Sequence, residues 1–307
     1  MRVLRGIVIL AVIGIFCIAA VFVAKPDLPD ELSGHLPWID QKEETAPVVP
    51  EGSTFRIRFF DVGEADAALV ECDGHYMMID GGDPEDARQI QAYLKEHKIR
   101  KLDCVVCSHV HADHAGGLAG ALADVSVKKA YAPVTTSDIW AFKSFVLYLK
   151  EQKKKITVPT PGDSFSLGGA EVTFLGPVDM SLAEENENNS SLIVRIEYGK
   201  TSFLFTGDAE IAEEQSVAGS WGVKLQSTVL KAGHHGSYTS SIREFLDLVQ
   251  PKYCVISVGA DNEHDHPHDT TLDRLSEYAR KIYRTDRDGS VDCSSDGQKV
   301  TFETEKQ

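Results

Sequence analysis

The feature that most constrains this chain is a run of metal-binding side chains within residues 108–117. His109, His111, Asp113 and His114 fall within six residues. Imidazole nitrogen and carboxylate oxygen are the ligands that zinc and similar metals prefer. In an extended chain, alternate side chains point to the same side, and a helical turn then brings His114 to a neighbouring position. The spacing therefore predicts one metal on the first two histidines and a second metal on Asp113 and His114.

This motif resembles the His-x-His-x-Asp-His signature of the metallo-β-lactamase superfamily. The resemblance implies three further elements in a fixed order, each a strand that ends in a residue of the metal site. All three are present, as residues 76–82 with Asp80, residues 203–208 with Asp208, and residues 229–237 with His234 and His235. The implied fold is α/β, an αβ/βα four-layer sandwich built from residues 54–307.

The resemblance also implies a role for each residue. The match to Asp208 bridges two divalent ions, which activate a water when they lie about 3.5–4 Å apart, and Asp113 belongs to the catalytic group. Asp80 supports a ligand histidine by accepting its second N–H. Spacing leaves both late histidines open as the last ligand. Because relatives place an aromatic residue after the ligand, we predict His234 as the ligand and His235 as its supporting neighbour.

One departure from the superfamily pattern affects the first metal. Many members supply a third histidine to this metal from the region that matches residues 187–192, which contains none here. Either Asn188 or Asn189 supplies an amide oxygen in its place, or both only cap backbone groups of a loop. We expect two divalent ions, zinc first, with manganese as the alternative because it favours oxygen ligands.

Further motifs narrow the resemblance to the soluble hydrolase domain of ComEC-type DNA-uptake proteins. They lie at residues 60–67, 79–82, 188–192, 230–237 and 266–268. The resemblance implies cleavage of a phosphodiester, either DNA or a small molecule. Phosphorylcholine esterases share the motif at residues 60–67 and use metal ions in the same way. A metallohydrolase of a phosphorylcholine ester, a lactone or an amide is therefore the alternative, followed by a non-catalytic surface binding protein.

Four other residues are candidates for supporting roles. Asp66 either supports the metal site or is an acid of a turn, and Lys231 either contacts a phosphate or extends from a strand end to solvent. His266 or His268 either donates a proton to the leaving oxygen or belongs to a polar loop, since histidine titrates near neutral pH.

The N-terminus predicts a membrane segment. Residues 6–24 form an uninterrupted apolar run preceded by Arg2 and Arg5, and the run is close to the roughly 20 residues needed to cross a bilayer. Basic residues on this side place the N-terminus in the cytoplasm and the remainder outside. We predict that residues 1–24 are an uncleaved anchor, and a cleaved signal peptide with secretion of the domain is the alternative.

The remaining chain divides into a linker and one domain. Residues 25–53 are rich in proline and acids, which is typical of a linker, and residues 54–307 suit one hydrolase domain. The net charge of −16 opposes tight, nonspecific binding of DNA. A helix is expected over residues 138–152, with Trp140 and its neighbouring aromatic residues in the core. No protein partner can be inferred.

Overall fold

The computed structural model describes residue 49 and residues 51–306 of the 307-residue chain. The predicted anchor, residues 1–24, lies outside the described residues, as does most of the predicted linker, residues 25–53. Within the described part, none of the helices combines the length and the apolar composition needed to cross a membrane. The described residues therefore correspond to the predicted hydrolase domain.

The first sheet carries the metal-binding motif. In the sheet order given below, neighbouring strands pair antiparallel from the first strand to the fifth and parallel from the fifth to the eighth. The alternating sequence Phe55–Phe59 buries every second side chain, whereas the parallel strand before the motif buries three successive side chains at its carboxyl end, as strands covered on both faces do. In sheet order the strands are β15 (Val300–Thr304), β14 (Val291–Ser295), β1 (Phe55–Phe59), β2 (Ala67–Cys72), β3 (His75–Gly81), β4 (Lys101–Val106), β5 (Ser126–Tyr131) and β6 (Ile156–Thr157).

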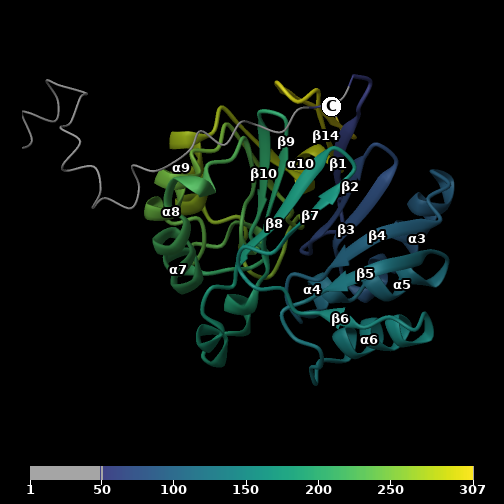
Figure 1. The fold of residues 1–307 in the computed structure, drawn as a ribbon. Coiled ribbons are helices and arrows are strands. Elements are labelled where there is room, and N and C mark those ends of the chain that lie inside the picture. Colours follow the sequence, from purple (N-terminus) through teal and green to yellow (C-terminus); the bar gives the residue numbers. More distant parts are fainter. Residues whose placement is uncertain (1–48, 50, 307) are drawn as a thin grey trace, which may run out of the picture. The chain divides into compact units, whose positions relative to one another are not determined.

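Three helices cover the outer face of this sheet (Figure 1). They are α3 (Ala87–Glu96), α5 (Leu118–Ala123) and α6 (Trp140–Glu151). In α6, Phe142 and Phe145 are buried, but the Trp140 ring is 68% exposed. At about 100° per residue, position 140 lies opposite the face formed by Phe142, Phe145 and Leu149. The prediction of Trp140 as a core residue is therefore wrong.

The second sheet supplies the later motifs. Helices α7 (Ile211–Trp221), α8 (Arg243–Val249) and α9 (Asp269–Tyr278) pack on its outer face. In sheet order its strands are β13 (Lys281–Arg284), β12 (Tyr253–Ile256), β11 (Val229–Lys231), β10 (Thr201–Phe205), β9 (Ile193–Tyr198), β8 (Ala170–Gly176) and β7 (Ser164–Leu167). Shorter helices are η1 (Pro84–Asp86), α4 (Ala112–Ala115), η2 (Met180–Glu184), η3 (Glu187–Ser190), η4 (Gly222–Leu225), η5 (His234–Gly236) and α10 (Thr285–Asp288).

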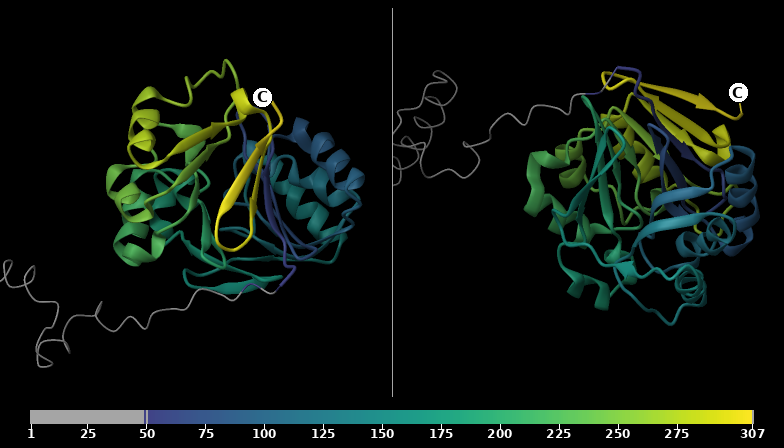
Figure 2. Two further views of the ribbon diagram at one scale, coloured as in Figure 1. Left: turned by 90° about the horizontal axis from the view of Figure 1, so that it is seen from above. Right: turned by 45° about the vertical axis from the view of Figure 1, so that its right-hand side comes forward.

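The two sheets pack face to face through apolar side chains from both. The Phe55 ring stacks on Phe203 with centroids 4.8 Å apart, and Phe59 stacks on Phe205 at 5.6 Å. Figure 2 shows the two sheets between two helical layers. This helix–sheet–sheet–helix order confirms the predicted α/β four-layer sandwich for the described residues.

A backbone crossing holds the motif against the end of β3. Gly117 N–H donates a hydrogen bond to the Gly82 carbonyl at 2.9 Å. A Cβ atom on Gly117 would lie only 1.7 Å from the Gly81 carbonyl oxygen, so only glycine fits at this position. This close approach places α4 directly over the strand that carries Asp80.

Candidate metal centre

The motif loop is fixed by Asp80, near the carboxyl end of β3. Its Oδ1 accepts a hydrogen bond from Ser108 N–H at 2.6 Å, at the start of the loop. Its Oδ2 lies 2.9 Å from Nδ1 of His114, at the other end of the loop. Asp80 and the His114 ring are both buried. Asp80 therefore orients His114 with Nε2 toward the interior of the site, which is the supporting position predicted for it.

Asp208 enters from the other sheet, just beyond β10, and lies at the centre of the site. Its Oδ1 is 3.2 Å from His114 Nε2. Its Oδ2 is 3.7 Å from His235 Nε2 and 3.9 Å from His109 Nε2. Asp208 is thus the carboxylate that faces histidines from both sets of predicted ligands.

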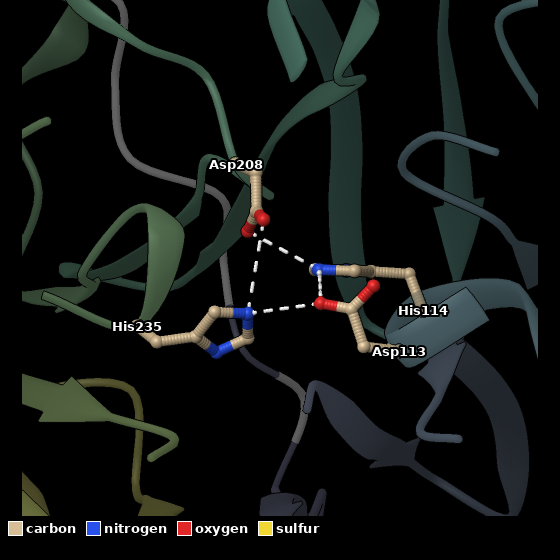
Figure 3. A group of neighbouring side chains, drawn as sticks. All are labelled: Asp113, His114, Asp208 and His235. Carbon is tan, nitrogen blue, oxygen red and sulfur yellow. Dashed lines mark hydrogen bonds and ion pairs between the residues drawn. The ribbon is translucent and has the colours of Figure 1, made fainter. Parts of the chain in front are cut away.

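Four residues converge around one point (Figure 3). One ligand atom from each of Asp113, His114, Asp208 and His235 lies within 4.8 Å of the other three. The buried atoms His114 Nε2 and Asp208 Oδ1 face each other without a hydrogen-bond partner among the described residues. Buried polar atoms are rarely left unpaired, and a divalent cation accepts this set of nitrogen and oxygen donors. The residues therefore fit a metal ion, and we call these four the buried half of the centre.

The two late histidines lie at similar distances from Asp208 Oδ2, 3.8 Å from His234 Nε2 and 3.7 Å from His235 Nε2, but they differ in burial. His235 is buried, with Nδ1 at 3.0 Å from the Ser257 carbonyl oxygen and Nε2 at 3.3 Å from Asp113 Oδ2. His234 is 23% exposed, and its Nδ1 lies 3.2 Å from Glu210 Oε1. Both histidines adopt positive φ angles, 47° and 51°, and the resulting turn directs the His235 ring inward. His235 therefore joins the predicted His234 as a candidate ligand, and its burial and its contact with Asp113 favour it.

The other two motif histidines lie beside this group. His109 is buried, and its Nε2 is 3.0 Å from Nδ1 of the partly exposed His111. His111 Nε2 in turn lies 3.3 Å from Glu187 Oε2, on η3. These three side chains form what we call the open half of the centre. Glu187 comes from the region that lacks the third histidine, and sequence reasoning missed it, although it directly precedes the two asparagines considered there.

The charges of the buried half are arranged to receive a cation. Burial disfavours a charged His114, but the carboxylates of Asp208, Asp113 and Asp80 outweigh burial and raise its pKa well above the usual value. Burial likewise opposes protonation of His235, yet Asp208, Asp113 and Asp66 raise its pKa to about 9. Burial raises the pKa of Asp208, but the nearby histidines reverse this and hold it well below the usual value. Positive charge is therefore stabilised at this position.

Comparisons with known proteins agree with this geometry. The sequence model described as "Metallo-beta-lactamase superfamily" matches residues 60–260. The chain belongs to this superfamily. Like other members of the superfamily, it has two facing sheets and a candidate metal centre at their edge. The diiron β-hydroxylase CmlA from Streptomyces venezuelae has a similar fold, with a TM-score of 0.50 and 14% identity over 76% of this chain and 53% of that one.

Two curated relatives are named for competence. Competence protein ComA of Neisseria gonorrhoeae is 29% identical over 79% of this chain, and ComE operon protein 3 of Bacillus subtilis is 30% identical over 68%. The matched regions are 32% and 27% of those proteins. This superfamily member thus spans about a third of the length of these relatives. The resemblance to ComEC-type proteins is confirmed at the level of this domain.

Lys231 does not reach the surface of the site. Its side chain is 3% exposed, its Nζ lies 2.8 Å from Asp66 Oδ1, and it donates a hydrogen bond to the Ala232 carbonyl. Asp66 Oδ1 is also 3.6 Å from His235 Nδ1. The predicted phosphate contact of Lys231 is corrected to a buried ion pair, whereas Asp66 lies behind His235 as predicted for a supporting residue.

The two asparagines both bond to Glu210, and the Asn188 amide oxygen is buried without a hydrogen-bond partner among the described residues. Asn189 Oδ1 accepts a hydrogen bond from Glu210 N–H at 3.1 Å, and Asn188 Nδ2 donates to Glu210 Oε1 at 2.9 Å. The amide oxygen of Asn189 is therefore engaged in capping, and its support of the site is indirect, through Glu210 and His234. A signal for Glu210 existed in the sequence, since it lies two residues after Asp208.

The late histidine loop places His266 closer to the centre than His268. The His266 ring centroid is 5.4 Å from that of His234, and its Nδ1 is 2.7 Å from Glu64 Oε1. Glu64 Oε2 accepts a hydrogen bond from Gly259 N–H at 2.8 Å, which fixes the carboxylate. His268 instead accepts a hydrogen bond from Tyr238 N–H through Nδ1. His266 is the stronger candidate for a proton donor, and Glu64 was missed because it lies 202 residues away in the sequence.

Proposed function

We propose that this chain is a two-metal phosphodiesterase of the ComEC hydrolase-domain type, with nuclease activity as its specific form. The observation that carries the proposal is Asp208, whose Oδ1 faces His114 and whose Oδ2 faces both His235 and His109. A carboxylate shared by two sets of ligands suits a pair of divalent ions. The similarity to competence proteins supports a phosphodiester as the substrate class.

Each half of the centre has a defined part in this proposal. Bound divalent ions would supply an activated water and would neutralise charge on the phosphoryl oxygens. His114 and His235 would hold one ion, with tautomers fixed by Asp80 and by the Ser257 carbonyl. In the open half, His109 and His111 would hold the other ion, with Glu187 as an additional oxygen donor.

His266 is proposed to protonate the leaving oxygen. Glu64 engages Nδ1 and so orients the ring, which leaves Nε2 as the atom that transfers the proton. Replacement of His266 by alanine should lower kcat by about 10²–10⁴ for a poor leaving group. The loss should be smaller for p-nitrophenolate, which leaves without a proton. Equal losses on both substrates would reject the proton-donor role.

Zinc is the proposed metal because the buried half combines imidazole nitrogen with carboxylate oxygen. Manganese is the alternative for the open half, where a carboxylate stands in place of a third histidine. Metal analysis of the purified chain, followed by reconstitution with each metal in turn, distinguishes these possibilities.

We also propose that the domain lies outside the cytoplasmic membrane, attached through residues 6–24. The support is the apolar run with its basic flank at Arg2 and Arg5. Intact protein should be found in the membrane fraction, and protease should release the domain by cleavage within residues 25–53. A shortened soluble product in the medium would indicate signal cleavage instead.

A small phosphodiester is the alternative substrate to DNA, since a net charge of −16 repels polyanions. The decisive experiment is a screen of bis-p-nitrophenyl phosphate, single- and double-stranded DNA, and phosphorylcholine esters with zinc- or manganese-loaded protein. A chain that binds two metals and cleaves no phosphodiester would overturn the proposal and favour a metallohydrolase of another bond.

A further inference from the structure

Lysines gather in one groove of this otherwise acidic protein. The groove lies between the C-terminal half of α6 and the edge strand β6, and its volume is about 490 Å³. Its lining consists of Thr135, Val146, Leu149, Lys150, Lys153, Lys154, Lys155 and Ile156. None of these described lining residues is acidic. The local charge is thus opposite in sign to the net charge of −16.

The basic character continues beyond this groove. Lys154 also lines an adjoining hollow of about 760 Å³, together with Lys101 and Lys128. Asp124 and Glu151 line the same hollow, so the charge there is mixed. The acid-free groove is therefore the centre of the basic surface, which we call the lysine groove.

An exposed stripe on α6 leads away from the lysine groove. Trp140, Lys143, Leu147 and Lys150 are spaced by three or four residues, which places them on one side of the helix. The Trp140 ring is 68% exposed and Leu147 is 57% exposed. A flat indole in solvent beside lysines is the combination that binds unpaired bases and their phosphates.

Helix α6 also connects this surface to the candidate metal centre. It packs against α4, the short helix that carries Asp113 and His114. Its 12 residues span about 18 Å, and the stripe lies on the solvent side of α6, opposite the buried face. A strand held along the stripe would therefore be separated from α4 by the thickness of one helix, about 10 Å.

We infer that the lysine groove and the α6 stripe dock a single strand of nucleic acid. This inference rests on the proposed function, because it identifies the polymer that the centre would cut. Lysine ammonium groups pair with phosphates, and an indole stacks on bases without regard to sequence. A membrane surface fits less well, since on this stripe each apolar side chain is separated from the next by lysine.

The test measures binding of a fluorescein-labelled thymidine oligonucleotide of about 20 nucleotides to the full chain in non-ionic detergent. EDTA removes metals so that binding is measured without cleavage. The variant Lys150→Glu/Lys153→Glu/Lys155→Glu should bind at least about tenfold more weakly by fluorescence anisotropy. Its plot of log K against log salt concentration should become less steep by about 2, at about 0.7 per lost phosphate contact.

A control with the same change in net charge separates the groove from general electrostatics. The variant Lys200→Glu/Lys224→Glu/Lys252→Glu alters exposed lysines on other elements and should bind as tightly as the wild type. Equal weakening in both triple variants would overturn the inference. Trp140→Ala should weaken binding by about tenfold with the salt slope unchanged, because stacking releases no counterions.

Two further measurements distinguish this inference from its alternatives. Hydrolysis of bis-p-nitrophenyl phosphate should be unchanged in the groove variant, since this small substrate needs no docking surface. If the wild type binds the oligonucleotide through the groove but cleaves no phosphodiester, the proposed function is wrong and the inference about the docking surface still holds. The groove variant can also be tested on vesicles of phosphatidylcholine and phosphatidylglycerol. If this variant loses binding to the vesicles but still binds the oligonucleotide, the surface docks on a membrane, and the inference is overturned.

Discussion

The two halves of the candidate metal centre differ in how firmly the protein holds their ligands. In the buried half, His114 and His235 are 0% and 3% exposed, and each has a fixed partner at Nδ1. In the open half, His109 is 0% exposed, but the His111 side chain is 33% exposed and Glu187 is 56% exposed. Ligands that are oriented before binding lose less conformational freedom when the metal arrives. We therefore expect the buried half to bind its ion more tightly.

The largest effect should follow from removal of the residue that the two halves share. Asp208→Ala should abolish phosphodiester hydrolysis, by at least about 10³-fold, and lower the metal content of both halves. Elemental analysis and a rate assay on the same preparation check this result. Asp273→Ala, an exposed carboxylate on α9, is the control. If the Asp208→Ala variant keeps both metals, Asp208 does not bridge them.

The neighbouring histidines provide a matched pair. His235→Ala should remove the ion of the buried half and lower activity by about 10²–10³-fold, whereas His234→Ala should retain that ion and lose about tenfold or less. Folding of both variants can be checked by circular dichroism. The reverse order of metal loss would restore His234 as the ligand.

The buried half should also give the metal-free protein a pH dependence. Carboxylates outweigh burial and raise the pKa of His235 to about 9, above its ordinary value of 6.5. Between these values the folded state binds more protons than the unfolded state. The free energy of unfolding should therefore fall as the pH rises through this window, by about 3 kcal/mol from His235 alone.

Urea denaturation of EDTA-treated protein across this pH range measures the effect. His235→Gln should make the curve less steep and leave the part due to His114, whereas His111→Gln, from the open half, should leave its shape unchanged. A wild-type curve that is level across the window would contradict the assigned charges of the buried half.

The smallest effect should come from the open half. Glu187→Gln removes a charged oxygen donor beside His111 and should weaken one of two metal-binding steps by about tenfold, with the other step unchanged. A chelator titration that resolves both steps makes this measurement. Glu185→Gln, exposed in the same segment, is the control. Equal weakening of both steps would show that the two halves do not bind their ions independently.

Much of this centre could be predicted because its residues are close in sequence or end adjacent strands. The motif histidines, Asp80 and Asp208 are of this kind. The choice between His234 and His235 could not be predicted, because it depends on backbone angles that neither side chain dictates. Glu64 was equally inaccessible, since it meets His266 only through the fold.

Burial was also harder to predict than strand position. Lys231 ends a strand that lies between two parallel neighbours, and its side chain turns inward to Asp66 instead of toward solvent. Trp140 shows the opposite error, since an aromatic residue near two core phenylalanines lies on the outer side of its helix. In both cases the sequence identified the element, and packing decided the direction of the side chain.

The turn at His234, His235 and Gly236 has three successive positive φ angles, of 47°, 51° and 85°. A residue other than glycine costs roughly 1–2 kcal/mol in this conformation, so the turn stores energy that a bound metal would help to hold in place. When the ion leaves, this segment would be free to relax. Relaxation would then compete with rebinding, and the residence time of the ion would be governed by the motion of three residues as much as by the strength of its bonds.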